Sequence, residues 1–366
     1  MTTTGSEGLR SALIVGTGLM GTSVALALRA VGVEVQLRDR DPAAADLASA
    51  LGAGAVRTSD SPSVDLAVIA VPPASVATTV AGLQREGAAA VYTDLASTKG
   101  IAQREIEVIG DPTSYVGGHP LAGRERSGPG AARIDLFAGR PWVLTPSAAS
   151  SGHALATVRR MVELCEATVV VMDPDTHDRA VALVSHAPQV LASLVAARLL
   201  GADAEAVGLS GQGLRDVTRI AASDPALWTE ILAANAGAVA EVLAAVAADL
   251  DRVVSALRSA AAAPDPAAMD PVTAALRAGN AGRAALPGKH GGAPARFTAV
   301  PVLVPDKPGE LARLLTDVGT DGINLEDMRI EHSPGQPVGL VELAVRPALA
   351  EELVAALRAR GWAVHW

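Results

Sequence analysis

The sequence contains few aromatic residues and an excess of negative charge. Phenylalanine, tyrosine and tryptophan make up only 2% of the 366 residues, and the formal net charge at pH 7 is −9. Proteins that bind single-stranded nucleic acid stack its bases on aromatic side chains and attract its phosphates with a basic surface. We therefore expect no nucleic-acid partner, and we expect alanine, valine and leucine to fill the hydrophobic cores.

Cysteine is almost absent, since Cys165 is the single one in the chain. One thiol excludes a disulfide framework, which fits a cytoplasmic protein. Cys165 lies in a helical pattern, where a buried structural thiol is a simpler interpretation than a nucleophile or a metal ligand; we expect no metal site. Residues 1–8 lack the basic start and apolar core of a signal peptide, and charges interrupt the most apolar helices, so no membrane partner is expected.

Lysine occurs only at Lys99, Lys289 and Lys307. Lys99 follows Ser97 shortly after a predicted strand, and a compact ammonium at that place is a candidate for substrate binding. The alternative is that Ser97 caps the predicted helix at residues 100–109 and that Lys99 is solvated. The residues alone leave both interpretations open.

A glycine-rich turn follows the first predicted strand. Gly16, Gly18 and Gly21 have the GxGxxG spacing, in which glycines allow a tight turn, the approach of a pyrophosphate and close helix packing. Leu19 and Met20 lie within this turn, and the predicted helix at residues 22–31 follows it, with an N-terminus that faces the phosphates in such sites. We interpret these five residues as part of a dinucleotide site; the alternative is an ordinary glycine-rich turn.

The second predicted strand, residues 33–37, leads to Asp39 and Arg40. Asp39 lies just over twenty residues after Gly16, where a carboxylate that binds the cofactor ribose belongs. A carboxylate repels the 2′-phosphate of NADP, so Asp39 favours NAD, although Arg38 and Arg40 leave NADP open.

Strands and helices alternate as far as residue 118, which predicts an α/β fold with a doubly wound parallel sheet. The predicted strands are residues 11–15, 33–37, 65–71, 89–94 and 115–118, and the predicted helices are residues 22–31, 75–86 and 100–109. The carboxyl ends of parallel strands open on the cofactor side, where they present Val71, Pro72, Ser97 and His119. Histidine accepts a proton near neutrality, so His119 is the candidate catalytic base.

An all-helical region follows a strand pair at residues 142–145 and 168–172. Helices are predicted at residues 175–200, 204–209, 225–257 and 270–278. Alanine-rich helices that are apolar on several faces need a partner surface, so we expect this region to form a dimer.

Two polar clusters interrupt the helical region. His186 and Gln189 flank a proline that predicts a kink, and Arg215, Arg219 and Trp228 lie further along. Arg219 could hold a substrate carboxylate through two hydrogen bonds. The alternatives are a hydrogen-bonded core histidine for His186 and a surface ion pair with the neighbouring aspartate for Arg215.

The last seventy residues have the order βαββαβ, which predicts a small ferredoxin-like unit. The predicted organisation is therefore a dinucleotide-binding domain over residues 9–172, a helical substrate and dimerisation domain over 173–283, a linker over 284–295 and a C-terminal module over 296–366.

The motifs together resemble those of the prephenate/arogenate dehydrogenase (TyrA) family. They are Gly16-x-Gly18-x-x-Gly21, Asp94-x-x-Ser97-x-Lys99-Gly100, Gly117-Gly-His119-Pro-x-Ala-Gly123, Val184-Ser-His186-x-Pro188 and Arg215-Asp-x-Thr-Arg219-Ile-Ala with Asp224-Pro and Trp228. The resemblance spans nearly the whole chain, and the tail from Arg296 is similar to an ACT domain. It implies oxidative decarboxylation of prephenate to 4-hydroxyphenylpyruvate with NAD in tyrosine biosynthesis; the alternative substrate is arogenate, which gives tyrosine directly.

The resemblance also implies roles for single residues. His119 matches the base that takes up the proton of the substrate's 4-hydroxyl, and Ser97 matches a serine that hydrogen-bonds around that hydroxyl and the nicotinamide. Arg219 matches the arginine that grips a substrate carboxylate, while Trp228 and Arg215 shape the site.

One position departs from the family pattern, because the helix motif often ends in histidine where this chain has Gln189. That position lies near the substrate's side chain in the family, so a neutral glutamine leaves prephenate and arogenate both open. For the C-terminal module the resemblance implies an amino-acid effector, tyrosine, near Asp306, Gly309 and Asn324. The alternative is a module that only adds dimer contacts.

Two other functions compete with this prediction. A β-hydroxyacid dehydrogenase shares the two-domain plan but needs a lysine on the helical domain, and no lysine occurs between Lys99 and Lys289. A non-catalytic nucleotide and amino-acid sensor would not need Ser97, His119 and Arg219 to converge.

Overall fold

The computed structural model describes residues 8–122, 127–263, 266–286, 297–332 and 337–366. The chain divides into two compact units, Met1–Val246 and Ala247–Trp366, and each is described by itself.

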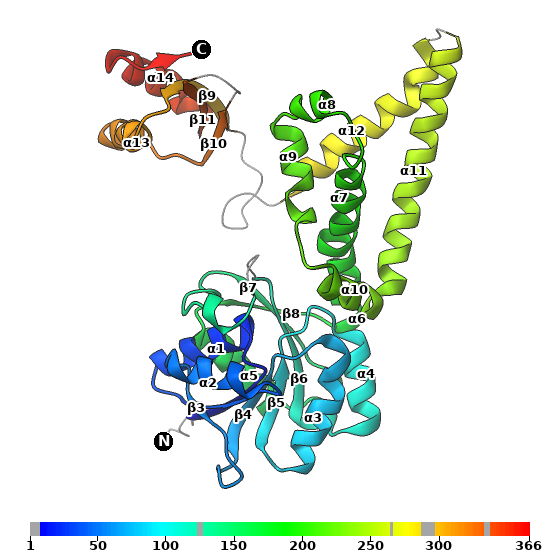
Figure 1. Cartoon of the computed structure of the whole chain (residues 1–366), viewed down its shortest axis with the longest axis vertical. Coiled ribbons are helices and arrows are strands. Elements are labelled where there is room, and N and C mark those ends of the chain that lie inside the picture. The colour runs from blue at the N-terminus through cyan, green and yellow to red at the C-terminus, as the bar shows by residue number, and fades with distance from the viewer. Residues whose placement is uncertain (1–7, 123–126, 264–265, 287–296, 333–336) are drawn as a thin grey trace, which may run out of the picture. The chain divides into compact units, whose positions relative to one another are not determined.

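An eight-stranded sheet forms the centre of the first unit, with the order β3-β2-β1-β4-β5-β6-β7-β8 (Figure 1). The strands are β1 (Ser11–Val15), β2 (Glu34–Arg38), β3 (Ala55–Val56), β4 (Val64–Ile69), β5 (Ala89–Asp94), β6 (Tyr115–Pro120), β7 (Pro141–Thr145) and β8 (Thr168–Val171). Strands β1 to β6 are parallel, as predicted. Strand β7 is antiparallel to β6 and parallel to β8, and both lie beyond the strands for which a parallel sheet was predicted. The described residues between β6 and β7 form no crossover α-helix, and antiparallel neighbours need none.

Helices cover both faces of this sheet, because successive side chains of a strand point to opposite faces. They are α1 (Leu19–Ala30), α2 (Pro42–Ala50), α3 (Val76–Arg85), α4 (Gly100–Ile109) and α5 (Gly152–Leu164). Ala12 and Ile14 of β1 share a core with α1, α2 and α5, whereas Leu13 shares the opposite core with α3 and α4. The predicted doubly wound arrangement is therefore present, with α2 and β3 as elements that the sequence did not predict.

Helices alone make up the rest of the first unit. They are α6 (Pro174–Val181), the π-helical turn η4 (Ala182–His186), α7 (Ala187–Ala197), α8 (Ala204–Gly208), α9 (Gln212–Thr218), the short turn η5 (Arg219–Ala221), α10 (Pro225–Ala234) and α11 (Ala236–Ala262), whose last part belongs to the second unit. The irregularity predicted beside Pro188 is the π-helical turn, which ends just before it. The predicted single helix at residues 225–257 was wrong, since α10 and α11 meet at Asn235 with a bend of 97°.

The segment Pro174–Ala197 is the one unbroken helix among the described residues that is long and apolar enough to cross a membrane. It also carries His177, Asp178 and His186, whose polar side chains are buried against other parts of the first unit. Core helices of globular proteins pass the same test of length and hydropathy, and 33% of the tested window of this segment is buried.

The second unit contains α12 (Asp270–Ala284) and a four-stranded antiparallel sheet with the order β10-β11-β9-β12. The C-terminal elements are β9 (Thr298–Pro305), α13 (Glu310–Thr320), β10 (Asp327–His332), β11 (Val338–Val345), α14 (Ala350–Ala359) and β12 (Ala363–Val364), which follow the predicted βαββαβ order. Alternate residues such as Val302 and Leu343 are buried with Leu353 of α14. Residues 287–296, most of the predicted linker, lie outside the described residues.

Candidate active site

Glycines make the turn between β1 and α1 possible. Gly16 has a φ of +99°, and a Cβ added to it would lie 2.4 Å from the carbonyl oxygen of Ala70. A Cβ on Gly21 would lie 2.0 Å from the carbonyl oxygen of Gly16. A cleft of 800 Å³ beside this turn is lined by, among others, Gly16, Gly18, Asp39, Arg40, Val71 and Pro72. The structure therefore brings together six of the predicted cofactor residues, while Leu19 and Met20 begin α1 without lining the cleft.

Asp39 is held at the edge of this cleft by Thr17 and Asp41. One carboxylate oxygen accepts hydrogen bonds from the backbone N–H and hydroxyl of Thr17, at 2.6 and 2.9 Å, and the other accepts from the backbone N–H of Asp41 at 2.9 Å. Burial alone would raise the pKa of Asp39, but these hydrogen bonds outweigh it and hold the pKa below 3.8. The carboxylate is charged at neutral pH. Arg38 is paired with Glu86 at 2.8 Å.

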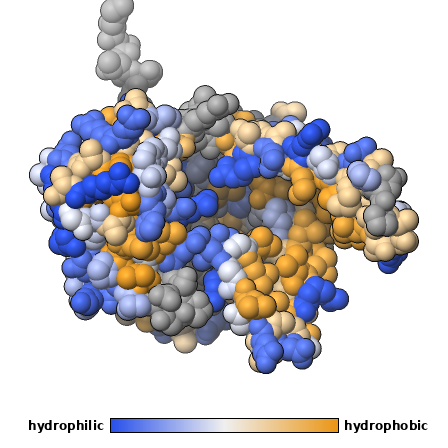
Figure 2. Space-filling model, turned by 90° about the horizontal axis from the view of Figure 1, so that it is seen from above, coloured by the Kyte–Doolittle hydropathy of each residue, from blue (hydrophilic) through white to orange (hydrophobic). Residues whose placement is uncertain are grey.

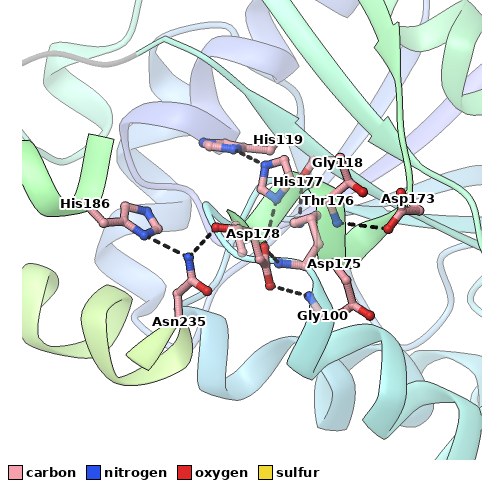
Figure 3. Close-up of polar contacts among 12 residues, drawn as sticks. Gly100, Gly118, His119, Asp173, Asp175, Thr176, His177, Asp178, His186 and Asn235 are labelled. Carbon is pink, nitrogen blue, oxygen red and sulfur yellow. Dashed lines mark hydrogen bonds and ion pairs between the residues drawn. The ribbon is translucent and has the colours of Figure 1, made fainter. Parts of the chain in front are cut away.

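A chain of three hydrogen-bonded side chains runs from α6 to the end of β6 (Figure 3). The Asp178 carboxylate lies 2.8 Å from Nδ1 of His177, and Nε2 of His177 lies 2.8 Å from Nδ1 of His119. A carboxylate only accepts, so Nδ1 of His177 carries the hydrogen and Nε2 of the neutral ring is an acceptor. His119 therefore donates through Nδ1, and its Nε2 keeps a free lone pair. This arrangement selects the tautomer of His119 that can take up a proton.

Electrostatics keep His119 neutral and Asp178 charged. Burial lowers the pKa of His119 well below 6.5, and positive charge at His177, Lys99 or His186 acts in the same direction. Burial alone would raise the pKa of Asp178, but hydrogen bonds from His177 and from the backbone N–H groups of Gly100 and Lys99, the latter two at 2.8 Å, hold it below 3.8. Asp178 thus joins α6 to the N-terminus of α4, where the helix dipole favours an anion.

A second buried carboxylate, Asp94 at the end of β5, lies beneath β6. It accepts hydrogen bonds from the Lys99 ammonium and, at 2.5 Å, from the hydroxyl of Tyr115. Lys99 also donates to the carbonyl oxygen of Gly118 at 2.6 Å, directly before His119. The Lys99 side chain is 0% exposed, so the alternative of a solvated lysine was wrong. The ammonium has no exposed surface with which to contact a substrate, and its observed partners make it a support of the backbone at His119.

A second cleft, of 730 Å³, opens beside His119. It is lined by, among others, Pro120, Arg133, Arg140, Val181, Val184 and Ser185. Neither Ser97 nor Arg219 lines it, so the structure does not gather the three predicted reaction residues into one surface. Ser97 is half-buried, and α4 begins without a side-chain cap, which makes the capping alternative for Ser97 wrong.

Gln189 contacts the protein rather than an open cleft. It is 6% exposed, and its amide donates to the carbonyl oxygen of Ile220 at 3.0 Å and to the hydroxyl of Ser223 at 3.2 Å. These bonds hold the turn η5, on which Arg219 is exposed. The observed position of Gln189 makes it a support for Arg219.

His186, Trp228 and Arg215 surround this part of the helical region. His186 is 1% exposed, and its ring meets that of Trp228 edge-on at a centroid distance of 6.0 Å. The structure thus shows the hydrogen-bonded core histidine that the sequence left open, and a substrate contact by His186 stays a prediction. Arg215 is exposed, and the surface pair with Asp216 is not formed, because Asp216 accepts from Gln212 at 2.8 Å.

Known proteins share both parts of this arrangement. Residues 24–171 match the family model of the nucleotide-binding domain of prephenate dehydrogenase, and residues 173–264 match that of its dimerization domain. A probable prephenate dehydrogenase, NovF, of Streptomyces niveus is 41% identical in an alignment of 365 positions that covers 97% of this chain and 99% of that protein. The chain belongs to the prephenate/arogenate dehydrogenase (TyrA) family. The family predicted from the motifs is therefore confirmed.

Two solved structures of TyrA-family enzymes have the same fold. Prephenate dehydrogenase of A. aeolicus, in complex with hydroxyphenyl propionate and NAD+, is 28% identical with a TM-score of 0.67, over 76% of this chain and 99% of that chain. Arogenate dehydrogenase of Synechocystis is 26% identical with a TM-score of 0.62, over 75% of this chain and 98% of that chain. The Rossmann-type domain and the helical dimerisation domain of the TyrA fold are both present.

The helices of the dimerisation domain carry an apolar surface, drawn in orange in Figure 2. The exposed large apolar residues of this domain include Leu183, Val184, Leu194, Leu200 and Leu209, with exposures from 56% to 87%. Monomers rarely leave so many large apolar side chains in water, so this surface agrees with the predicted dimer.

Three residues of the TyrA site were missed in the sequence: His177, Asp178 and Asn235. The adjacent pair His177-Asp178 at a predicted helix start was a usable signal, since a histidine beside a carboxylate near His119 would have suggested a relay. Asn235 gave no signal, because it lies inside a pattern that predicted one continuous helix.

The residues predicted to bind an effector lie at the start of α13 and before β10. Asp306, Gly309 and Asn324 are exposed, and Asn324 donates to the carboxylate of Glu326 at 3.1 Å. Gly309 has a φ of +89° and precedes α13, so this turn needs glycine. Effector binding by these residues stays a prediction.

Proposed function

We propose that this TyrA-family enzyme converts prephenate to 4-hydroxyphenylpyruvate and CO2 with NAD, in the pathway to tyrosine. The observation that carries the proposal is the hydrogen-bonded chain from Asp178 through His177 to Nδ1 of His119, a residue that lines a cleft. A base of this kind suits removal of a hydroxyl proton during oxidation at the same carbon.

The residues around the β1–α1 turn fit NAD. A Cβ at Gly16 or Gly21 would fill the turn, so glycine leaves the backbone open to a pyrophosphate, and charged Asp39 suits a ribose while repelling a 2′-phosphate. NAD, when bound, accepts the hydride that leaves C4 of the substrate ring. Gly16, Gly18, Asp39, Val71 and Pro72 would hold it.

His119 takes up the proton of the substrate's 4-hydroxyl and later returns it. As hydride leaves C4, positive charge develops on that carbon, and transfer of the 4-hydroxyl proton to Nε2 of His119 lowers the barrier. Asp178, acting through His177, stabilises the imidazolium that forms. Loss of the ring carboxylate as CO2 supplies the electron pair that makes the ring aromatic, and His119 returns the proton to the phenol oxygen. The family resemblance assigns orientation of the hydroxyl to Ser97 and binding of a substrate carboxylate to Arg219, neither of which lines the His119 cleft.

Arogenate is the second candidate substrate. It differs from prephenate by an ammonium in place of a keto group on the side chain. The NH2 group of Gln189 donates to Ile220 and Ser223, so its amide oxygen is the group left to contact the ammonium of arogenate.

Initial rates of NADH formation with prephenate and with arogenate, each with NAD and with NADP, test the proposal. We expect turnover of prephenate with NAD, and loss of most of it in His119→Ala. No turnover of either substrate by the wild type would contradict the proposal and favour the sensor.

The remaining features of the enzyme are proposed on the same basis. The domain limits are residues 9–172, 173–283 and 296–366, the enzyme is a cytoplasmic homodimer through its helical domain, and the C-terminal module is an ACT domain that binds tyrosine. In support, the module has the βαββαβ order and exposes Asp306 and Asn324 beside turns. Tyrosine inhibition that is unchanged in Asp306→Ala and Asn324→Ala would contradict the assignment of the effector site.

A further inference from the structure

Asn235 lies at the corner between α10 and α11 and is 6% exposed. Its side-chain nitrogen lies 2.7 Å from the backbone carbonyl oxygen of Asp178 and 3.1 Å from Nδ1 of His186 (Figure 3). One buried amide thus joins three segments that are far apart in the sequence.

The contact with Asp178 identifies which end of the amide faces the two partners. A backbone carbonyl oxygen can only accept a hydrogen bond, so the atom 2.7 Å from it is the NH2 nitrogen of Asn235. That nitrogen has two hydrogens. One points to Asp178 and the other is available for His186.

The orientation of Asn235 then determines the tautomer of His186. Because the NH2 group donates to Nδ1, this ring nitrogen must carry a lone pair, and the hydrogen of the neutral ring lies on Nε2. His119 has the opposite tautomer, with hydrogen on Nδ1 and a lone pair on Nε2. The two histidines of one network are therefore held in complementary states by Asn235 and by His177.

We propose that Asn235 is a positioning residue of the active site, which holds His186 neutral with hydrogen on Nε2 and anchors the α6 segment that carries His177 and Asp178. A cation at His186 would lower the basicity of His119, since positive charge at His186 lowers the pKa of that ring. The titratable groups that act on His186 are Asp178 and His177 of α6 and His119 of β6. A neutral His186 therefore leaves the basicity of His119 unchanged.

Nitrogen-15 NMR of the histidine rings tests the tautomer of His186 without a measurement of enzyme activity. The chain has seven histidines, and the His186 signals are assigned by their loss in His186→Gln. We expect an unprotonated Nδ1 in the wild type and a protonated Nδ1 in Asn235→Asp, because a carboxylate in this place accepts a hydrogen bond and cannot donate one. The matched control is Asn280→Asp on exposed α12, where the His186 signals should not change. A proton on Nδ1 in the wild type would overturn the proposal, whether or not Asn235→Asp folds.

Kinetics test the consequence for the reaction, and this part rests on the proposed function. At pH 7 we expect kcat of Asn235→Asp to fall by roughly 10-fold to 100-fold, and to recover as the pH rises and His186 loses its proton. Asn280→Asp should show neither effect. A loss of kcat that does not recover with pH would indicate a merely structural role and overturn the positioning role. Absence of turnover in the wild type would contradict the proposed function instead, and would leave the NMR result intact.

Discussion

Two buried carboxylates near the start of α4, Asp94 and Asp178, are compensated in different ways. Asp94 faces the ammonium of Lys99 and the hydroxyl of Tyr115, so a cation lies against its charge, although burial lowers the pKa of Lys99. Asp178 faces two backbone N–H groups and Nδ1 of the His177 ring. The first pair is electrically balanced, and the second retains a negative charge. One carboxylate therefore fixes the backbone at His119, while the other can stabilise a positive charge that appears on its side chain.

The largest effect is expected at His119, where both carboxylate systems meet. Replacement His119→Asn removes the base while keeping a polar side chain of similar reach, and kcat should fall by about 10²-fold to 10⁴-fold. The free energy of unfolding, measured in urea, should change little. If His119→Asn keeps more than a tenth of the wild-type kcat, His119 is not the base.

Breaking the ion pair between Lys99 and Asp94 should reduce stability more than activity. Lys99→Met leaves the buried charge of Asp94 without its cation, which should lower the free energy of unfolding by about 3–5 kcal/mol. Adding Asp94→Asn should restore part of the loss, and Lys307→Met, at an exposed lysine, is the matched control. Equal urea midpoints for Lys99→Met and Lys307→Met would show that the pair contributes no stability.

Breaking the hydrogen-bonded chain from Asp178 through His177 to His119 should reduce activity more than stability. His177→Asn separates Asp178 from His119, so kcat should fall by roughly 10-fold to 100-fold, the range found when orienting partners of reacting groups are removed. Stability should fall less than in Lys99→Met. A kcat equal to that of the wild type would mean that Asp178 serves only to join α6 to α4.

Lowering the pH should change kcat/KM through His119 and stability through Asp178. The pKa of His119 is lowered well below 6.5, so the neutral base persists as the pH falls through 6.5, and kcat/KM should begin to fall only at lower pH. The folded pKa of Asp178 is also lowered, so its contribution to stability is complete above the unfolded value of 3.8 and is lost as the pH falls through the folded pKa. A kcat/KM that halves at pH 6.5 would contradict the environment described for His119.

The smallest effect is expected at Gln189, outside both carboxylate systems. Gln189→Leu leaves the carbonyl of Ile220 and the hydroxyl of Ser223 without their donor, and the turn that carries Arg219 should loosen. We expect KM for prephenate to rise about tenfold, the equivalent of one lost buried hydrogen bond, with kcat nearly unchanged. Gln189→Glu should behave in the same way, because it also lacks the donor. A fall in kcat at constant KM would place Gln189 in the chemistry instead.

Local patterns were sufficient for the sheet of the first unit. The predicted strand at residues 89–94 and helix at 100–109 agree with β5 and α4, because the hydrophobic patterns of a buried strand and an amphipathic helix are specified by neighbouring residues. The same reasoning failed at Asn235, where alanine-rich sequence favours a continuous helix and the bend depends on contacts with residues more than forty positions away. The direction of β7 was not predicted for a similar reason, since strand polarity depends on the path of the intervening chain.

By itself, the sequence determined the chemistry of the protein: the glycine turn, Asp39, His119 and the order of motifs that places the chain in the TyrA family. These features depend on residue type and spacing, which are visible in the sequence itself. Only the tertiary structure decided how each charge is used, namely that Lys99 is buried against Asp94, that Gln189 supports Arg219, and that His177 and Asp178 back His119. The physical reason is that tautomers, burial and ion pairing are set by contacts between segments distant in the chain.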